Sequence, residues 1–139
     1  MVSRAPKIKS WKHAGLRCHI RRNPEILNYC GYVCLPVGHP FYEKGYDETE
    51  DLEVHGGLKY TDLEDGDWVV GFDCAHFGDF IGGLIEIMER TKNHTEAELT
   101  EIARKRNEHY WTLQEVVAET NRLAEQLAKV MPKENLLEL

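Results

Sequence analysis

The apolar pattern near the C-terminus constrains the fold more than any other feature of the sequence. Apolar and small side chains recur there at steps of three and four residues, at Leu113, Val116, Val117, Thr120, Leu123, Ala124, Leu127 and Val130. This spacing predicts an amphipathic helix of about five turns. Thr112 and Glu115 form a capping-box pattern before it, and Pro132 ends it. Such a helix needs a large apolar surface to cover.

Four upstream segments are expected to supply that surface as strands. Residues 15–22 alternate apolar and basic side chains, and residues 29–35 are apolar up to Pro36. Residues 51–60 and 68–76 are expected to pair as an antiparallel hairpin around an aspartate-rich turn at 61–67. The sequence therefore predicts an α+β fold, in which an antiparallel sheet of about four strands carries the long C-terminal helix on one face.

The length and charge of the chain limit the classes of protein that it can belong to. Its 139 residues suit a single domain, 1–139, with a variable charged helical segment at about 81–110. Within this segment, a second capping pattern, Thr95 and Glu98, precedes a short helix. A net charge of −7 argues against binding of duplex nucleic acid. No apolar run is long enough for a membrane span, and the basic N-terminus lacks the apolar region of a secretory signal. Reduced thiols are expected for the four cysteines.

Three polar blocks are candidates for a functional site. His39 lies between a glycine and a proline, His55 precedes Gly56 and Gly57, and Asp73, His76 and Asp79 follow the most apolar strand. Histidine exchanges protons near neutral pH, so we expect His55, His76 and His39 as catalytic residues, with Asp73 and Asp79 as their partners. The alternative for each block is structural: a loop histidine at 39, a β-bulge at the glycines and a turn cap at Asp79.

Two mechanisms fit these residues. In the first, His55 and His76 (or His39) act as a base–acid pair on a phosphodiester, while Lys59, Tyr60 or an N-terminal arginine neutralises the phosphate. In the second, His55, His76 and Asp79 hold Zn²⁺ or Mn²⁺, which activates water. The spacing matches no standard motif such as HExxH, so the sequence favours the version without a cofactor.

The ordered blocks GYVCLPVGHPFY, EVHGGLKY, DWVVGFDCAHFGD and TNRLAEQLA resemble a family of small phage- and prophage-encoded proteins with GHPxY, HGGLTY and GFDCAHxGD motifs. The match covers residues 29–80 and about 112–129, and it departs from the family pattern at Lys59 and Val69. The resemblance implies a counter-defence protein that acts on a nucleotide immune signal in the cytoplasm of an infected bacterial host. It places His39, His55, Asp73, His76 and Asp79 in one pocket.

Three functions follow from these observations. The first is cleavage of a cyclic nucleotide signal, favoured by the number of titratable side chains. The second is a nonenzymatic sponge for such a small nucleotide ligand, which would bind it in an interface pocket of a homo-oligomer through Tyr42, Tyr60, Arg17 and Arg21. The third is an acidic inhibitor of a host protein. The three tryptophans are expected in the core or at its edge, and Glu119, Arg122, Glu125 and Lys129 on a solvated helix face.

Overall fold

The computed structural model describes residues 5–24, 27–49, 52–76, 78–81 and 94–131. Five antiparallel strands form one sheet in the order β1-β2-β3-β5-β4. Their bounds, with those of a short 3-10 turn and two helices, are β1 Lys7–His13, β2 Leu16–Arg22, β3 Tyr29–Leu35, the turn Tyr46–Glu48, β4 Tyr60–Glu64, β5 Asp67–Asp73, α2 Glu96–Lys105 and α3 Leu113–Lys129. The α+β architecture is confirmed, with five strands in place of about four.

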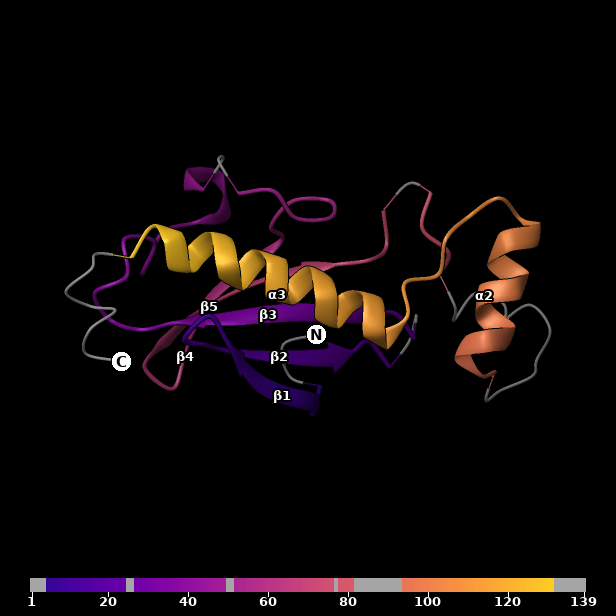
Figure 1. The fold of residues 1–139 in the computed structure, drawn as a ribbon, viewed down its shortest axis with the longest axis horizontal. Coiled ribbons are helices and arrows are strands. Elements are labelled where there is room, and N and C mark those ends of the chain that lie inside the picture. The colour runs from indigo at the N-terminus through magenta and orange to yellow at the C-terminus, as the bar shows by residue number, and fades with distance from the viewer. Residues whose placement is uncertain (1–4, 25–26, 50–51, 77, 82–93, 132–139) are drawn as a thin grey trace.

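Helix α3 lies along one face of the sheet, over β1, β2 and β3 (Figure 1). The side chains that it buries are five of the predicted apolar or small positions: Val116, Thr120, Leu123, Ala124 and Leu127. They meet the inward side chains of the strands, among them Leu16, Ile20, Val33 and Phe72, in one core cluster. The helix covers this face because burying its apolar side is what stabilises it.

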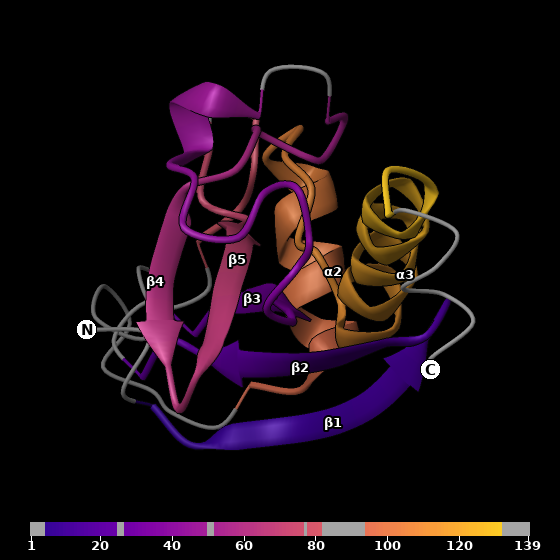
Figure 2. The same ribbon diagram turned by 90° about the vertical axis from the view of Figure 1, so that its left-hand side faces the viewer.

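The sheet is strongly twisted, so that β4 and β5 stand steeply to β1 and β2 (Figure 2). Helices α2 and α3 lie on the same side of it (Figure 2). The face away from α3, which we call the second face, has its own smaller buried cluster of Cys30, Tyr32, Cys34 and Val69. All four cysteines are buried free thiols, and burial raises the pKa of Cys18 and of Cys30 to about 12.

Two strand predictions need correction. Strand β1 was not predicted, because it is an edge strand whose side chains are almost all exposed and carry no apolar alternation. The predicted strand at 51–60 is wrong over residues 52–59, which form a loop, and the strand lies instead at Tyr60–Glu64, where a turn was expected. The antiparallel hairpin with β5 is present, with Glu64 opposite Asp67.

The tight turn of this hairpin explains the shift. Asp65 and Gly66 have φ values of 50° and 85°, so both central residues of the two-residue turn adopt the left-handed conformation. Asp-Gly is a preferred pair for this turn, whose twist matches that of the flanking strands. The abundance of aspartate around it marked the whole of 61–67 as a turn, although only two residues are needed.

Both predicted capping boxes are confirmed. The Thr95 and Thr112 side chains accept hydrogen bonds from the backbone N–H groups of Glu98 and Glu115, and each glutamate accepts one in return. Helix α2 confirms helical structure over part of the charged segment, whose residues 82–93 lie outside the described residues. Leu99 and Ala103 join α2 to the core. Among the residues that the structure describes, no helix is long and apolar enough to cross a membrane.

Candidate functional site

The HGG loop, residues 55–57, is held against the middle of α3. The backbone N–H of His55 donates to Glu119 Oε2 at 2.7 Å. Arg122, one turn along the helix, pairs with the same carboxylate at 2.8 Å, and its hydrogen bond lowers the pKa of Glu119. Glu119 was expected on a solvated face, but only 12% of its side chain is exposed. It anchors the loop that carries His55.

Gly56 makes room for the second histidine of the site. It has a φ of 70°, and a Cβ placed on it would lie 2.1 Å from His76 Nε2. Any side chain at this position would therefore collide with the imidazole ring of His76. The sequence interpretation left the glycine pair as either a bulge or an opening for a ligand. The structure shows instead that the missing side chain lets two loops pack closely.

Buried residues of the core hold the loop after β5 in place. Cys74 is fully buried, and the Asn28 side chain donates to the carbonyl oxygens of Cys74 and Phe80 at 2.7 and 3.1 Å. Within the loop, Asp79 Oδ2 accepts from the backbone N–H of His76 at 2.9 Å. Asp79 therefore caps the turn that precedes it. The structural alternative for Asp79 was a cap on the turn that follows it.

The two loops bring together two histidine–aspartate pairs. His55 Nε2 is 2.8 Å from Asp79 Oδ2, and only 4% of the Asp79 side chain is exposed. His76 Nε2 is 2.9 Å from Asp73 Oδ1, a distance for an ion pair, although the atoms are not aligned as a hydrogen bond. The two imidazole rings meet edge to face, with centroids 5.4 Å apart. His55, His76, Asp73 and Asp79 therefore form one cluster, the dyad cluster.

Trp111 closes one side of the dyad cluster. Its indole ring stacks on the imidazole of His55, with centroids 4.3 Å apart and an interplanar angle of 29°. His109 meets the indole edge to face and pairs with Glu115 at 2.8 Å. Trp111 is half-buried at the edge of the core, as expected, and it also supports a site residue. The capping box at Thr112 fixes the chain immediately after it.

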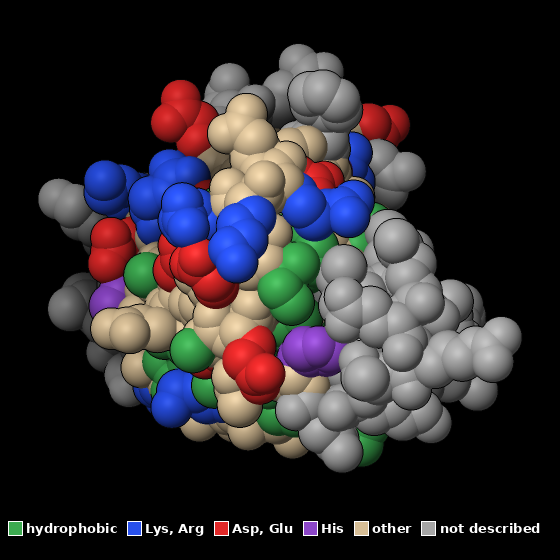
Figure 3. All heavy atoms as spheres, turned by 90° about the vertical axis from the view of Figure 1, so that its right-hand side faces the viewer, with side chains coloured by type: hydrophobic (Ala, Val, Ile, Leu, Met, Phe, Trp, Pro, Cys, Tyr) green, Lys and Arg blue, Asp and Glu red, His purple; other side chains and the backbone are tan. Residues whose placement is uncertain are grey.

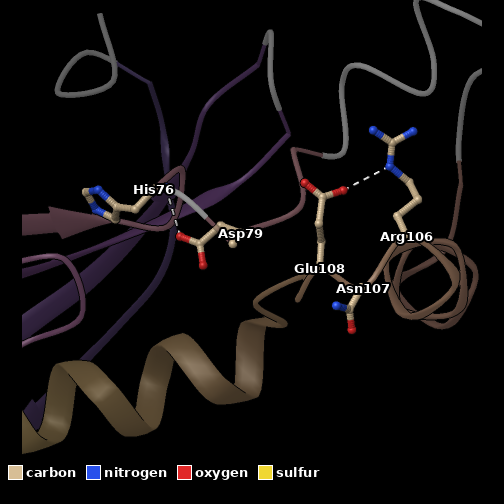
Figure 4. A pocket seen from close by; sticks show the side chains of 6 residues that line it. His76, Asp79, Arg106, Asn107 and Glu108 are labelled. Carbon is tan, nitrogen blue, oxygen red and sulfur yellow. Dashed lines mark hydrogen bonds and ion pairs between the residues drawn. The ribbon is translucent and has the colours of Figure 1, made fainter.

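An open cavity of about 730 Å³ adjoins the cluster. Its described lining consists of His76, Gly78, Asp79, Arg106, Asn107 and Glu108. Asp79 lies on one side, and Arg106, paired with Glu108 at 2.9 Å, lies across the cavity (Figure 4). Figure 3 looks onto the end of the molecule formed by α2, where Lys and Arg side chains gather beside acidic ones. Arg104, Lys105 and Arg106 are exposed at the C-terminal end of α2.

His39 is not brought to the dyad cluster. Its Nε2 contacts the backbone oxygen of Leu127 at 2.8 Å, and its Nδ1 accepts from the N–H of Phe41 at 3.0 Å. Leu127 is eight residues beyond Glu119 on α3, or about 12 Å along the helix axis. His39 is 3% exposed, and burial lowers its pKa. Both ring nitrogens are occupied by the backbone, so His39 secures the loop to the end of α3.

The expected phosphate-binding side chains also lie elsewhere. The Tyr42 hydroxyl donates to the Gly66 oxygen at the β4–β5 turn. Tyr60 donates to Glu64 at 2.7 Å and packs on Tyr32, and Arg17 pairs with Asp67; these contacts are on the second face. Lys59 is exposed, and its backbone N–H donates to Gly71. The cation in the described lining of the cavity is Arg106, from the variable charged helical segment.

The alternative metal site needs three ligands that converge. Among the described residues, no group of three or more His, Cys, Asp or Glu side chains is arranged to hold a metal ion. His55 Nε2 faces Asp79, whereas His76 Nε2 faces Asp73. The arrangement is one of two side-by-side pairs, in which each carboxylate lies within ion-pair distance of one imidazole.

No family model, curated protein or solved structure matches the chain.

Proposed function

We propose that the dyad cluster is a metal-independent acid–base centre that hydrolyses a phosphodiester bond of a small cyclic nucleotide, as a phage counter-defence protein would. The observation that carries this proposal is the contact of two imidazoles, 5.4 Å apart, each beside its own aspartate. Hydrolysis of a phosphodiester needs one group to take a proton from water and another to give a proton to the leaving oxygen. Two histidines at this separation can divide these tasks.

The surroundings of the two rings suggest which histidine does which task. With Nε2–H of His55 donating to the buried Asp79, Nδ1 keeps its lone pair and can take a proton from water. The water oxygen then forms a bond to phosphorus. His76, whose protonated form Asp73 stabilises, donates a proton to the oxygen that leaves phosphorus. The reaction consumes one water molecule, and the proton gained by His55 returns to His76 through solvent.

The size and lining of the cavity support a nucleotide substrate. Ligand cavities for small molecules commonly measure about 300–1,000 Å³, a range that includes the 730 Å³ beside Asp79. Arg106 offers a guanidinium for a phosphate, and the Asn107 side chain offers an amide for a base or ribose edge. The same lining would serve a sponge, which binds the nucleotide without cleaving it. The dyad cluster is what favours chemistry over binding alone.

The test is incubation of the purified protein with a panel of cyclic dinucleotides and cyclic ADP-ribose isomers, with and without EDTA, followed by chromatography. The variants are His55→Gln and His76→Gln. The matched control is His13→Gln, because His13 also pairs with an acid, Glu125 at 2.6 Å, but lies on β1. The proposal expects a product peak that survives EDTA. Either site variant should lose activity at least about 100-fold, and the control should keep it.

Other outcomes separate the alternatives. If the ligand is recovered intact, and only after the protein is denatured, the function is sequestration and not hydrolysis. If the product no longer forms in EDTA, a metal ion and not the paired histidines carries out the reaction. Nucleotides that stay free and unchanged would overturn both nucleotide functions and leave the inhibitor of a host protein.

A further inference from the structure

The second face of the sheet carries a polar cluster of its own. Strand β2 alternates, so that Leu16, Cys18 and Ile20 join the core with α3 while Arg17, His19 and Arg21 point to the second face. A cavity of about 100 Å³ lies there, and its described lining is Lys7, Arg17, His19, Cys34, Glu64, Asp65, Asp67 and Val69. We call it the second-face cavity. Among the described residues, none lines both this cavity and the one beside Asp79.

His19 is buried in this cluster with one nitrogen unused. The residue is 3% exposed, and its ring stacks on Tyr32 with centroids 4.9 Å apart. Nδ1 faces the Cys34 sulfur at 3.9 Å, whereas Nε2 is buried and has no hydrogen-bond partner among the described residues. A buried polar atom without a partner costs free energy, so such an atom beside a cavity indicates something that the cavity holds.

The neighbouring thiol determines the chemical character of the unused nitrogen. Burial raises the pKa of Cys34 and lowers the pKa of His19 to about 4, so the thiol keeps its proton and the imidazole is neutral. The Cys34 S–H can then donate to Nδ1 of His19. A neutral imidazole that accepts at Nδ1 carries its hydrogen on Nε2. His19 Nε2–H is therefore a donor in need of an acceptor.

The other groups of this face also have donors to spare. Nε of Arg21 is buried without a partner, although the rest of its guanidinium bonds Ala5 and Glu64. Two of the three carboxylates that line the cavity are engaged, because Glu64 receives Arg21 and Tyr60, and Asp67 receives Arg17; the third is Asp65. The unmet requirement is for an acceptor near Lys7 and Arg17, the two cations of the described lining.

We propose that the second-face cavity binds a tetrahedral oxyanion, a phosphate, which accepts from His19 Nε2–H between Lys7 and Arg17. The cavity has about the volume of three water molecules, which suits a phosphate group but not a nucleoside. The phosphate can be the free ion or the end of a larger molecule whose remainder stays outside. This site is separate from the dyad cluster and does not depend on its function.

The test is a titration of the full-length protein with inorganic phosphate at constant ionic strength, with chloride as the exchanged anion. Binding is measured by calorimetry, and the ring ¹⁵N signals of the histidines are followed by NMR. We expect saturable binding that shifts the His19 signals and leaves those of His39 in place. His19→Gln should weaken binding at least tenfold, and His13→Gln, an exposed histidine on the neighbouring strand, should not.

A second titration with 5′-AMP identifies the source of the phosphate. Equal affinity at the His19 signals would assign the site to the free ion, and tighter binding there would assign it to the phosphate of a larger molecule. The absence of any saturable shift at His19 in the wild-type protein would overturn the proposal, even if His19→Gln fails to fold. Phosphate binding that survives His19→Gln would overturn it too. Neither result depends on whether the dyad cluster is catalytic.

Discussion

At the scale of single residues, the two adjacent glycines of the HGG loop have different tasks. Both have positive φ, 70° at Gly56 and 77° at Gly57, so alanine is strained at either position. Only at Gly56 would the added Cβ meet another side chain, the ring of His76 at 2.1 Å; at Gly57 nothing lies within 4 Å. The pair therefore separates backbone strain from packing against the site.

The first prediction compares alanine at these two positions. Gly57→Ala should lower the free energy of unfolding by about 1 kcal/mol, which is the cost of holding alanine at a positive φ. Gly56→Ala should lower it by about 2 kcal/mol more, because the ring of His76 must move. Chemical denaturation measures the difference, and turnover should fall with Gly56→Ala only. Equal losses for the two variants would contradict the contact between Gly56 and His76.

The second prediction concerns Asp79, whose Oδ2 serves two partners. Asp79→Asn keeps an oxygen for the N–H of His76, so the turn should survive and stability should change by less than about 1 kcal/mol. The amide carries no charge to stabilise a protonated His55, so turnover should fall about 100-fold or more. Asp73→Asn, at a side chain that is 39% exposed, should have a smaller effect. Steady-state rates of the two variants test this order.

The sequence predicted the members of the dyad cluster better than their pairing. Asp73 and His76 are three residues apart, so their contact is local and could be expected. His55 and Asp79 are 24 residues apart, and their contact depends on how two loops pack against α3. Sequence spacing holds no information on such a contact. The same limit applies to His39, which lies apart from the dyad cluster at a partner, Leu127, that is 88 residues away.

At the scale of elements, the sequence predicts best the segments that bury one face. Strands β2, β3 and β5 and both helices were found by their apolar patterns and caps. Strand β1 and strand β4 are the two edges of the sheet. Their side chains are mostly exposed or half-buried, so these strands have no alternation of apolar and polar residues from which they could be predicted. The loop at 52–59 alternates like a strand, but two residues with positive φ prevent regular pairing.

The third prediction tests the helix cap that lies beside the site. Thr112→Ala removes the side chain that accepts from Glu115 N–H and should lower the free energy of unfolding by about 1 kcal/mol. It should also lower turnover, because Trp111, which stacks on His55, directly precedes the cap. Thr95→Ala removes the corresponding cap of α2 and is the control. It should lower the free energy of unfolding by a similar amount but leave turnover unchanged. Thr112→Ser should restore both properties.

At the scale of the whole molecule, one sheet separates two polar sites. The core with α3 occupies one face, and the dyad cluster lies where the β5 loop and the HGG loop meet at that helix. The second-face cavity is on the opposite side, over Cys34 and Val69. Because no residue that the structure describes lines both cavities, changes at His19 and at His55 should have additive effects on stability.

The buried histidines should make the whole fold sensitive to acid. Burial lowers the pKa of His19 to about 4 and also lowers that of His39, while in the unfolded chain both titrate near 6.5. Between these values the unfolded state binds more protons than the folded state, so the free energy of unfolding must fall as the pH falls. For His19 the pKa difference corresponds to a loss of roughly 3 kcal/mol between pH 6.5 and pH 4.

The fourth prediction isolates this contribution by comparing wild type with His19→Gln in a buffer free of phosphate. Chemical denaturation at a series of pH values should show a stability advantage of the wild type that is largest above pH 6.5 and shrinks toward pH 4. The carboxylates titrate in both proteins and cancel in the difference. Parallel curves for His19→Gln would mean that His19 is not buried as a neutral ring in the folded protein.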